Sequence, residues 1–318
     1  MIDHTVPHLT PVRSFSVAER AMRWHRRATM SMTRIDPRGT TLPGGSAVAV
    51  GMFDGVHRGH RQLLAELRAH ANSRGLATVV VTFDPHPRQI LQPASAPPML
   101  CRLEDRLELL AATGLVDHCL VLPFDRQRSQ ESADDFVETI LLDRLGMRVL
   151  VVGENFACGR GRQGDIAYLR SAGARLGFEV HAQPLHRVAA ADRLGPCSST
   201  VVRRLVVEGD VAAAAIVLDR PHSLSGTLTE VDAEGGRVGV AIPPGLCLPP
   251  DGEYVGAVQA PMRGTGWRST RLAVRRDDCA ARQLVLISAL SGMRAGESVE
   301  FRFHDQVAVR CASAHATV

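Results

Sequence analysis

Residues 47–67 read AVAVGMFDGVHRGHRQLLAEL, and this stretch decides the fold of the chain around it. Its apolar start predicts a buried strand, its glycines predict a tight turn, and the leucines at 63, 64 and 67 have helical spacing. A helix N-terminus presents unpaired N–H groups and the positive end of the helix dipole, so it binds phosphate well. His57 and His60 share one face of this helix start and can donate to phosphoryl oxygens together. The stretch therefore indicates nucleotide chemistry.

Strands and helices alternate from this stretch to residue 221. Unbroken branched runs, such as VVV at 79–81, suit strands that are covered on both faces of a parallel sheet. We therefore expect a doubly wound, Rossmann-like α/β domain over 46–221. Strands are expected at 46–51, 77–83, 117–122, 148–153 and 178–182, and helices at 58–74, 102–113, 132–145, 163–176, 198–208 and 210–218.

The pattern changes on either side of this domain. Residues 1–45 lack a strand pattern and are expected to be a poorly ordered N-terminal extension, with one basic helix over 16–30. Beyond Pro221, short β-like runs separated by Gly and Pro turns predict a smaller all-β barrel over 222–318. These runs lie at 224–231, 237–242, 254–259, 269–275, 283–288 and 298–311.

The composition excludes several classes of protein. The chain has 318 residues, of which 45% are hydrophobic and 22% are charged, as expected for two globular domains. All 37 basic residues are arginine, so the lysines of a Walker A loop, a Schiff base and a kinase β3 strand are absent. Phosphate must then be bound by backbone N–H groups or by His, Arg, Ser or Thr side chains. Aromatic residues make up only 4%, which argues against a nucleic-acid surface built on base stacking.

The expected location is the cytoplasm, and the expected partners are small molecules. No apolar run approaches the roughly 20 residues of a membrane span, and the N-terminus lacks the apolar core of a signal peptide. The seven cysteines form no CxxC pair and fit a reducing compartment. We expect neither a nucleic-acid nor a membrane partner, and the sequence leaves the formation of a homo-oligomer open.

Three further clusters follow predicted strands, at the edge where an open α/β sheet binds its ligands. The first is FDPHP at 83–87, in which two prolines restrict the backbone around His86. The second is the glycine loop GENFACGRGRQGD at 153–165, and the third is CSSTVVR at 197–203, with hydroxyl groups at a helix start. Four such clusters at one sheet edge favour a phosphate site.

Each cluster also has a simpler interpretation. His57, His60 and His86 are three imidazoles that could ligate zinc, and His86 could instead brace a turn. The hydroxyls at 198–200 could serve as a helix N-cap, and the loop 153–165 could be a plain surface loop. Phosphate is favoured because the four clusters occur together, one of them at a glycine turn that starts a helix.

The same motifs, in this order, make the chain resemble the prokaryotic bifunctional riboflavin kinase/FAD synthetases over about residues 46–221. The stretches SADDF at 132–136, EGD at 208–210 and LDRP at 218–221 are similar as well. The resemblance implies a Rossmann-like nucleotidyltransferase module with an HxGH motif, acting as an FMN adenylyltransferase. ATP and FMN would be its substrates, FAD its product and Mg²⁺ its cofactor.

The resemblance also implies roles for individual residues, although it assigns none of them to the metal. Contact with the ATP phosphates and catalysis are expected of His57, His60 and Arg203. Nucleotide binding is expected of Gly51, Met52, Phe53, Asp54, Gly55, Gly59, Asn155, Ser199 and Thr200. Acceptor binding is expected of Phe83, Asp84, His86, Pro87, Cys158, Gly159, Arg162 and Asp165.

The sequence departs from the family in both domains. The family loop usually reads FxFG, with its second aromatic beside the flavin, and Cys158 stands at that position here. The family's kinase motif GRxLGxPTAN corresponds to GRVGVAIPP at 236–244, which lacks the Thr-Asn pair, and no acid occurs at 282–286 for the catalytic Glu. A degenerate riboflavin-kinase-like barrel without kinase activity is therefore expected.

Two alternatives to FMN adenylyl transfer remain open. One is transfer to a different phosphorylated acceptor in a specialised pathway, which Cys158 and the altered barrel suggest. The other is a non-catalytic regulator that binds a flavin or a nucleotide. The HxGH and SSTVVR clusters count against the regulator, because a binding protein has less need of groups for triphosphate chemistry.

Overall fold

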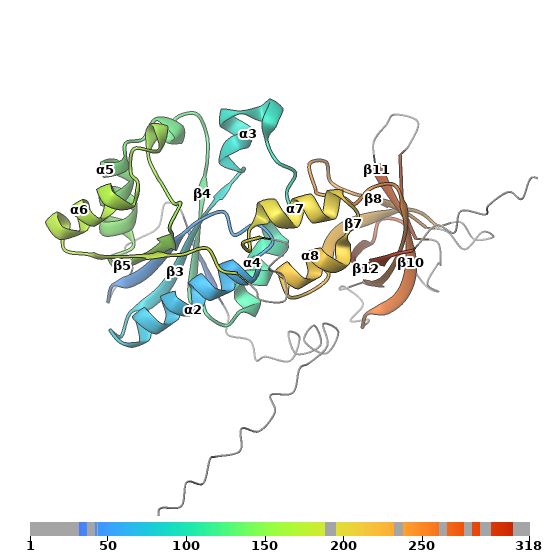
Figure 1. Cartoon of the computed structure of the whole chain (residues 1–318), viewed down its shortest axis with the longest axis horizontal. Coiled ribbons are helices and arrows are strands. Elements are labelled where there is room, and N and C mark those ends of the chain that lie inside the picture. Colours follow the sequence, from blue (N-terminus) through green and yellow to red (C-terminus); the bar gives the residue numbers. More distant parts are fainter. Residues whose placement is uncertain are drawn as a thin grey trace, which may run out of the picture.

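The computed structural model contains an α/β domain and a β-barrel domain that lie next to each other along the long axis of the molecule (Figure 1). The expected basic helix over 16–30 lies outside the residues that the structure describes. These are 32–36, 42, 44–187, 195–231, 238–260, 266–276, 282–286 and 294–307.

The first domain is built on a six-stranded sheet in the order β1-β4-β3-β2-β5-β6, in which all neighbours are parallel. The chain runs outward from β2 through β3 to β4 and then returns to β5 on the other side of β2. The strand order therefore reverses between β2 and β5, the point where open α/β sheets bind ligands. The strands are β1 (Thr33–Ile35), β2 (Ser46–Val50), β3 (Ala77–Asp84), β4 (His118–Pro123), β5 (Met147–Gly153) and β6 (Glu179–Gln183).

Helices cover both faces of this sheet, which confirms the doubly wound prediction. Alternate residues of a strand face opposite sides. Val80 belongs to the core with α2 and α4, whereas Val79 and Val81 belong to the core with η3 and α6. The helices are α2 (Arg58–Asn72), α3 (Pro87–Leu91), α4 (Leu103–Ala112), α5 (Ala133–Asp135), the π-helical η3 (Phe136–Arg144), α6 (Ile166–Leu176), α7 (Ser199–Val207) and α8 (Val211–Leu218), with short 3-10 turns η1 (Pro93–Ser95), η2 (Arg128–Gln130) and η4 (Arg160–Arg162).

One strand of the sheet lies within the segment that the sequence placed outside the fold. Thr33–Ile35 forms β1 and pairs in parallel with β4 at the edge of the sheet, where Thr33 lies opposite His118. The expectation that residues 1–45 contain no strand is therefore wrong for these three residues. The strand reads TRI, which is too short and too polar for a periodic signal, and its conformation is stabilised by pairing with β4.

The second domain is a closed barrel in the order β10-β11-β8-β7-β12-β9, in which every pair is antiparallel. The completely buried side chains of Tyr254, Leu272, Phe301 and Phe303 form part of its core. The predicted all-β domain is thus confirmed, although residues 308–311 of its last predicted strand lie outside the described part. The strands are β7 (His222–Val231), β8 (Val238–Ala241), β9 (Gly252–Gln259), β10 (Arg268–Arg276), β11 (Arg282–Leu286) and β12 (Ser298–Gln306).

The barrel is hydrogen-bonded to the loop that precedes α4. The N–H of Met99 donates to the Gly245 carbonyl at 2.7 Å, and the Met99 carbonyl accepts the N–H of Cys247 at 2.8 Å. Met99 is followed by Leu100 and Cys101, whose N–H groups bind the turn after β2. The second domain therefore contacts a segment that reaches the ligand-binding edge of the first.

Candidate active site

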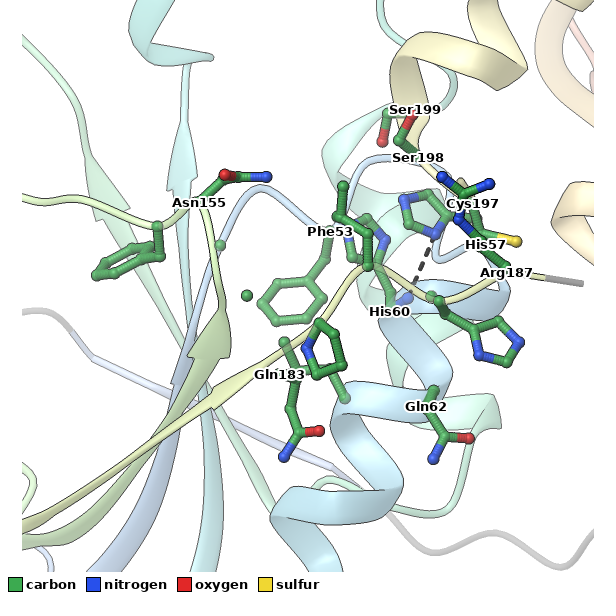
Figure 2. Close-up of a pocket in the computed structure, with 18 of the residues that line it drawn as sticks. Phe53, His57, His60, Gln62, Asn155, Gln183, Arg187, Cys197, Ser198 and Ser199 are labelled. Atoms are coloured by element: carbon green, nitrogen blue, oxygen red, sulfur yellow. Dashed lines mark hydrogen bonds between the residues drawn. The ribbon is translucent and has the colours of Figure 1, made fainter. Parts of the chain in front are cut away.

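A cleft of about 630 Å³ opens where the strand order reverses (Figure 2). Its lining includes Gly51, directly after β2, and Gly153, the last residue of β5. Seven residues that the sequence analysis assigned to the site line this cleft: Gly51, Phe53, His57, Gly59, His60, Asn155 and Ser199. The lining also includes residues that the sequence analysis missed, among them Gln62, Phe156, Gln183, Leu185, His186 and Arg187.

A signal for part of the missed lining is present in the sequence. Residues 183–187 follow the predicted strand at 178–182, so they belong to the same carboxyl edge as the other clusters. Polar side chains of Gln183 and Arg187 and the apolar Leu185 come from this segment. Because open α/β sheets bind ligands at the carboxyl ends of their strands, assigning the strand at 178–182 already indicates these residues.

His57 and His60 lie against each other in the cleft. His57 is the N-cap of α2, and its Nδ1 accepts the N–H of His60 at 3.3 Å, which Figure 2 marks as a dashed line. The imidazole rings stack with centroids 3.6 Å apart and 18° between their planes. Gly59 provides the necessary space, because a Cβ there would lie 2.9 Å from the carbonyl oxygen of Cys197. The HxGH spacing thus places two imidazoles at a helix N-terminus close to the segment before α7.

Burial keeps both histidines neutral. Desolvation lowers the pKa of His57 well below its ordinary value, and the charges of His60, Arg220 and Arg203 lower it further. Desolvation, followed by Arg203 and Arg220, lowers the pKa of His60 to about 3. The Nδ1 of His60 is buried and has no hydrogen-bond partner in the described part of the chain. In its N–H form this nitrogen can donate to an anion that enters the cleft, where the helix dipole also favours negative charge.

The Asp54 carboxylate joins three segments behind this helix start. Its side chain is 1% exposed and accepts the N–H groups of Leu100 and Cys101 at 3.0 and 3.3 Å. It also accepts Nη2 of Arg203 at 2.6 Å, while Nε of Arg203 donates to the Pro98 carbonyl at 2.7 Å. The predicted triphosphate ligand Arg203 is therefore ion-paired with Asp54, and neither residue lines the cleft.

The start of α7 is fixed to the same turn. The hydroxyl of Ser199 donates to the Asp54 carbonyl at 2.9 Å. The hydroxyl of Ser198 accepts the N–H of Val201 at 3.2 Å and caps the helix, as the simpler interpretation of this cluster proposed. Ser198 and Ser199 line the cleft, whereas Thr200 is exposed and does not.

The FDPHP segment braces the edge of the sheet. Nδ1 of His86 accepts the N–H of Arg88 at 3.1 Å and caps α3, so His86 acts as a turn brace here. Arg106, 1% exposed, donates to the carbonyls of Met52 at 3.0 Å and Phe83 at 3.1 Å. This buried arginine ties β3 to the glycine turn. Four predicted acceptor residues of this segment do not line the cleft: Phe83, Asp84, His86 and Pro87.

The loop 153–165 has an inner and an outer half. Its inner half supplies Asn155 and Phe156 to the cleft. In the outer half, Cys158 and Gly164 exchange backbone hydrogen bonds, and burial raises the pKa of the Cys158 thiol to about 11. Gly159 has φ 72°, and a Cβ there would lie 2.5 Å from the N atom of Ala133, so glycine is needed at this position.

The other predicted acceptor residues of the outer half also have local partners. Arg162 donates to the Asn155 carbonyl at 2.9 Å, and Asp165 caps α6 by accepting the N–H of Tyr168. Cys158, Gly159, Arg162 and Asp165 do not line the cleft. Met52 and Gly55, which were predicted to bind the nucleotide, do not line the cleft either.

The structure offers no support for a zinc site at the three histidines. Nδ1 of His57 and Nδ1 of His86 each accept a backbone N–H group and so serve as helix caps. Within the described ranges, no group of three or more His, Cys, Asp or Glu side chains could hold a metal ion.

No helix of the described part is long and apolar enough to cross a membrane.

The fold and the cleft define a Rossmann-like α/β domain with an HxGH motif at the switch point. Residues 40–193 match the FAD synthetase family, so this part of the chain is similar to FAD synthetases and the resemblance seen in the motifs is confirmed there. The match lies within the N-terminal part of the chain and does not extend to the barrel.

Curated relatives are similar to a part of the chain of comparable length. The chain is 34% identical over 195 residues to the bifunctional riboflavin kinase/FMN adenylyltransferase of Escherichia coli (strain K12), covering 61% of each chain. It is 38% identical over 182 residues to the protein of the same name from Pseudomonas fluorescens, covering 57% of each. The aligned part thus spans about three fifths of these relatives.

The two-domain architecture is found in a solved structure as well. The crystal structure of a macrolide-efflux protein from Streptococcus pneumoniae superimposes with a TM-score of 0.71 at 22% identity. The match covers 87% of this chain and 90% of that one. At this identity the likeness concerns the fold alone.

His60→Gln is expected to make the protein less sensitive to acid. The pKa of His60 is about 3 in the folded chain and near 6.5 when unfolded, so below pH 6.5 only the unfolded chain gains this proton. As the pH decreases below 6.5, this group should therefore lower the free energy of unfolding by roughly 1.4 kcal/mol per pH unit. Glutamine does not titrate and removes this contribution. Urea unfolding between about pH 6.5 and 4.5 measures it. Parallel profiles for wild type and variant would contradict the neutral, buried imidazole.

Arg203→Ala is expected to lower the free energy of unfolding by about 3–5 kcal/mol, because the Asp54 carboxylate stays buried without its partner charge. Adding Asp54→Asn should restore part of the loss, since a neutral amide costs less to bury. Urea unfolding of the two single variants and the double variant gives the coupling between them. Additive losses would mean that this ion pair does not join α7 to the glycine turn.

Proposed function

We propose that this chain is an ATP-dependent FMN adenylyltransferase that converts FMN and ATP to FAD and pyrophosphate. The observation that carries the proposal is the pair of stacked imidazoles at the N-terminus of α2, inside a cleft of a domain that matches the FAD synthetase family. The curated relatives carry FMN adenylyltransferase in their names.

The reaction needs positioning and neutralisation of charge, and no protein nucleophile. A phosphate oxygen of FMN attacks the α-phosphorus of ATP in line, and the bond from this phosphorus to the α–β bridging oxygen breaks. Pyrophosphate leaves with that oxygen. We assign the N–H groups at the start of α2 and the imidazoles of His57 and His60 to the charge that develops on the phosphates.

Nucleotide binding is proposed to change the state of these histidines. Both are neutral in the free chain because burial lowers their pKa. The negative charge of a triphosphate favours the protonated imidazole, so it should raise the pKa of His57 and His60. Ser199, which lines the cleft at the start of α7, is proposed to complete the triphosphate site. Arg203, whose Nη2 and Nε are bonded to Asp54 and Pro98, is proposed to add its positive charge from behind the cleft.

Mg²⁺ is proposed to enter with ATP. Magnesium usually keeps several waters and binds substrate phosphates together with one or two carboxylates. The carboxylate of Asp54 is already engaged by two N–H groups and by Arg203, so it is not a free ligand for the ion. The triphosphate is therefore expected to supply most of the ligands of Mg²⁺, which would partly neutralise the phosphate charge.

A different phosphorylated acceptor is the second candidate. The observation that favours it is Cys158, which stands in place of the family's second loop aromatic and bonds to Gly164 outside the cleft lining. Pyrophosphate release in a screen of acceptors distinguishes the proposals. FAD formation supports FMN as the acceptor, and release with another acceptor alone supports the second candidate. Nucleotide binding without release from any acceptor would support the non-catalytic regulator.

We also propose that the barrel has lost riboflavin kinase activity. The stretch after β8 reads Ile242-Pro243-Pro244, where the family motif has its Thr-Asn pair. Residues 282–286, which form β11, contain no acid for the role of the catalytic Glu. The chain would then depend on another enzyme for its FMN.

His60→Ala is expected to lower kcat for pyrophosphate release by roughly 100-fold or more, because it removes a group that stabilises charge in the transition state. The KM for FMN should change little. His70→Ala is the matched control, since His70 lies in the last turn of the same helix and is expected to keep its turnover. A pyrophosphate assay with both variants measures this, and near-normal turnover of His60→Ala would remove His60 from the site.

Riboflavin incubated with ATP, Mg²⁺ and the purified chain is expected to yield no FMN. Without the Thr-Asn pair and the acid, nothing in these motifs holds Mg-ATP or accepts the proton of the 5′-hydroxyl. Chromatography of the flavins measures this, with the Escherichia coli relative as positive control. A parallel sample with FMN shows that the same preparation is active. FMN formed from riboflavin would refute the loss of kinase activity.

A further inference from the structure

Asp219 connects the end of α8 to the start of the phosphate-site helix. It follows directly after α8 and has φ 60° and ψ 23°, a left-handed conformation that aspartate tolerates better than most residues. Its carboxylate accepts Nη2 of Arg58 at 2.6 Å and Nη1 of Arg61 at 2.8 Å. The Asp219 side chain is only 13% exposed, so these charge-assisted bonds are partly shielded from water.

The two arginines flank the histidines of the cleft. Arg58 follows His57 and Arg61 follows His60 in the first turn of α2, yet neither arginine lines the cleft. A single carboxylate therefore holds both guanidinium groups away from the cleft lining. The same two bonds restrain the helix turn that carries the histidines and the N–H groups of the phosphate site.

Arg220 extends this restraint to the glycine turn. It is buried, and its Nη2 donates to the Gly55 carbonyl at 2.6 Å while Nη1 donates to the Leu218 carbonyl at 3.2 Å. Arg220 thus bonds to the turn before His57, and Asp219 bonds to the helix turn after it. Only Pro221 separates these two residues from β7, so the segment that leads into the barrel also supports the proposed phosphate site.

We infer that Asp219 is a positioning residue for adenylyl transfer. Through Arg58 and Arg61 it fixes the first turn of α2, which carries both histidines. Small displacements of groups that stabilise a transition state cost rate more than they cost binding. This inference rests on the proposed adenylyl transfer, and its test includes one measurement that needs no reaction.

The first measurement compares Asp219→Asn with a matched control. Asparagine tolerates the left-handed conformation and keeps the size of the side chain, but it removes the charge. We expect kcat to fall about 10-fold and the KM for ATP to change less than about 3-fold, as for a displaced transition-state contact. The control Asp210→Asn removes the charge of the aspartate that caps α8 and should leave kcat unchanged. A kcat of Asp219→Asn equal to wild type, in a folded variant at 25 °C, would overturn the inference.

A mutant cycle tests the route through the arginines. Arg58→Gln/Arg61→Gln is expected to lower kcat as Asp219→Asn does, and the triple variant should lose little more, because all three changes remove the same contact. Asp219→Gly also accepts the backbone conformation and should match Asp219→Asn. Losses that add in the triple variant would show that Asp219 acts on the reaction by another route.

Hydrogen exchange separates this inference from the proposed function. The N–H of His60 bonds to His57 Nδ1 and that of Arg61 to the His57 carbonyl, so both amides report on the first turn of α2. In the free protein, Asp219→Asn should speed their exchange at least 10-fold and leave the first turn of α6 unchanged. Faster exchange in a chain that makes no FAD would support the restraint while the proposed function fails. Unchanged exchange would refute the restraint itself.

Discussion

The Asp54 carboxylate lies buried in the turn after β2, where a charge is costly unless its oxygens are occupied. The N–H groups of Leu100 and Cys101 and the guanidinium of Arg203 occupy them. Three segments distant in sequence must therefore meet at this carboxylate for the chain to fold. Their meeting fixes the backbone that leads into His57, so the geometry of the proposed phosphate site depends on the satisfaction of one buried charge.

The same requirement makes the two domains interdependent. The segment that supplies Leu100 and Cys101 begins at Met99, which pairs with Gly245 and Cys247 of the barrel domain. On the other side, the residues just before β7 bond to Gly55 and to the first turn of α2. If kinase activity is lost as proposed, the barrel would still support the first domain through these contacts, because they hold the glycine turn from two directions.

Burial also sets the chemical state of the histidines. Desolvation and the positive charges of Arg203 and Arg220 keep His57 and His60 neutral, although they lie at the positive end of a helix. The proposed triphosphate would reverse the sign of the surrounding field. The free site thus avoids a cluster of uncompensated cations, and the positive charge would appear only when the substrate supplies the negative charge to stabilise it.

The sequence by itself determined the sheet, its covering helices, the barrel and the HxGH helix start. Alternating and helical spacing of apolar residues and glycine turns act over a few neighbouring residues, so they are visible in the sequence. The tertiary structure alone decided that Thr33–Ile35 is a strand and that Gln62 and Phe156 line the cleft. It also decided that Arg203 pairs with Asp54, 149 residues away, and that Asp219 holds Arg58 and Arg61. Such partners are chosen by the burial of charges and by strand pairing in the folded chain, and no periodicity in the sequence records which distant segments will meet.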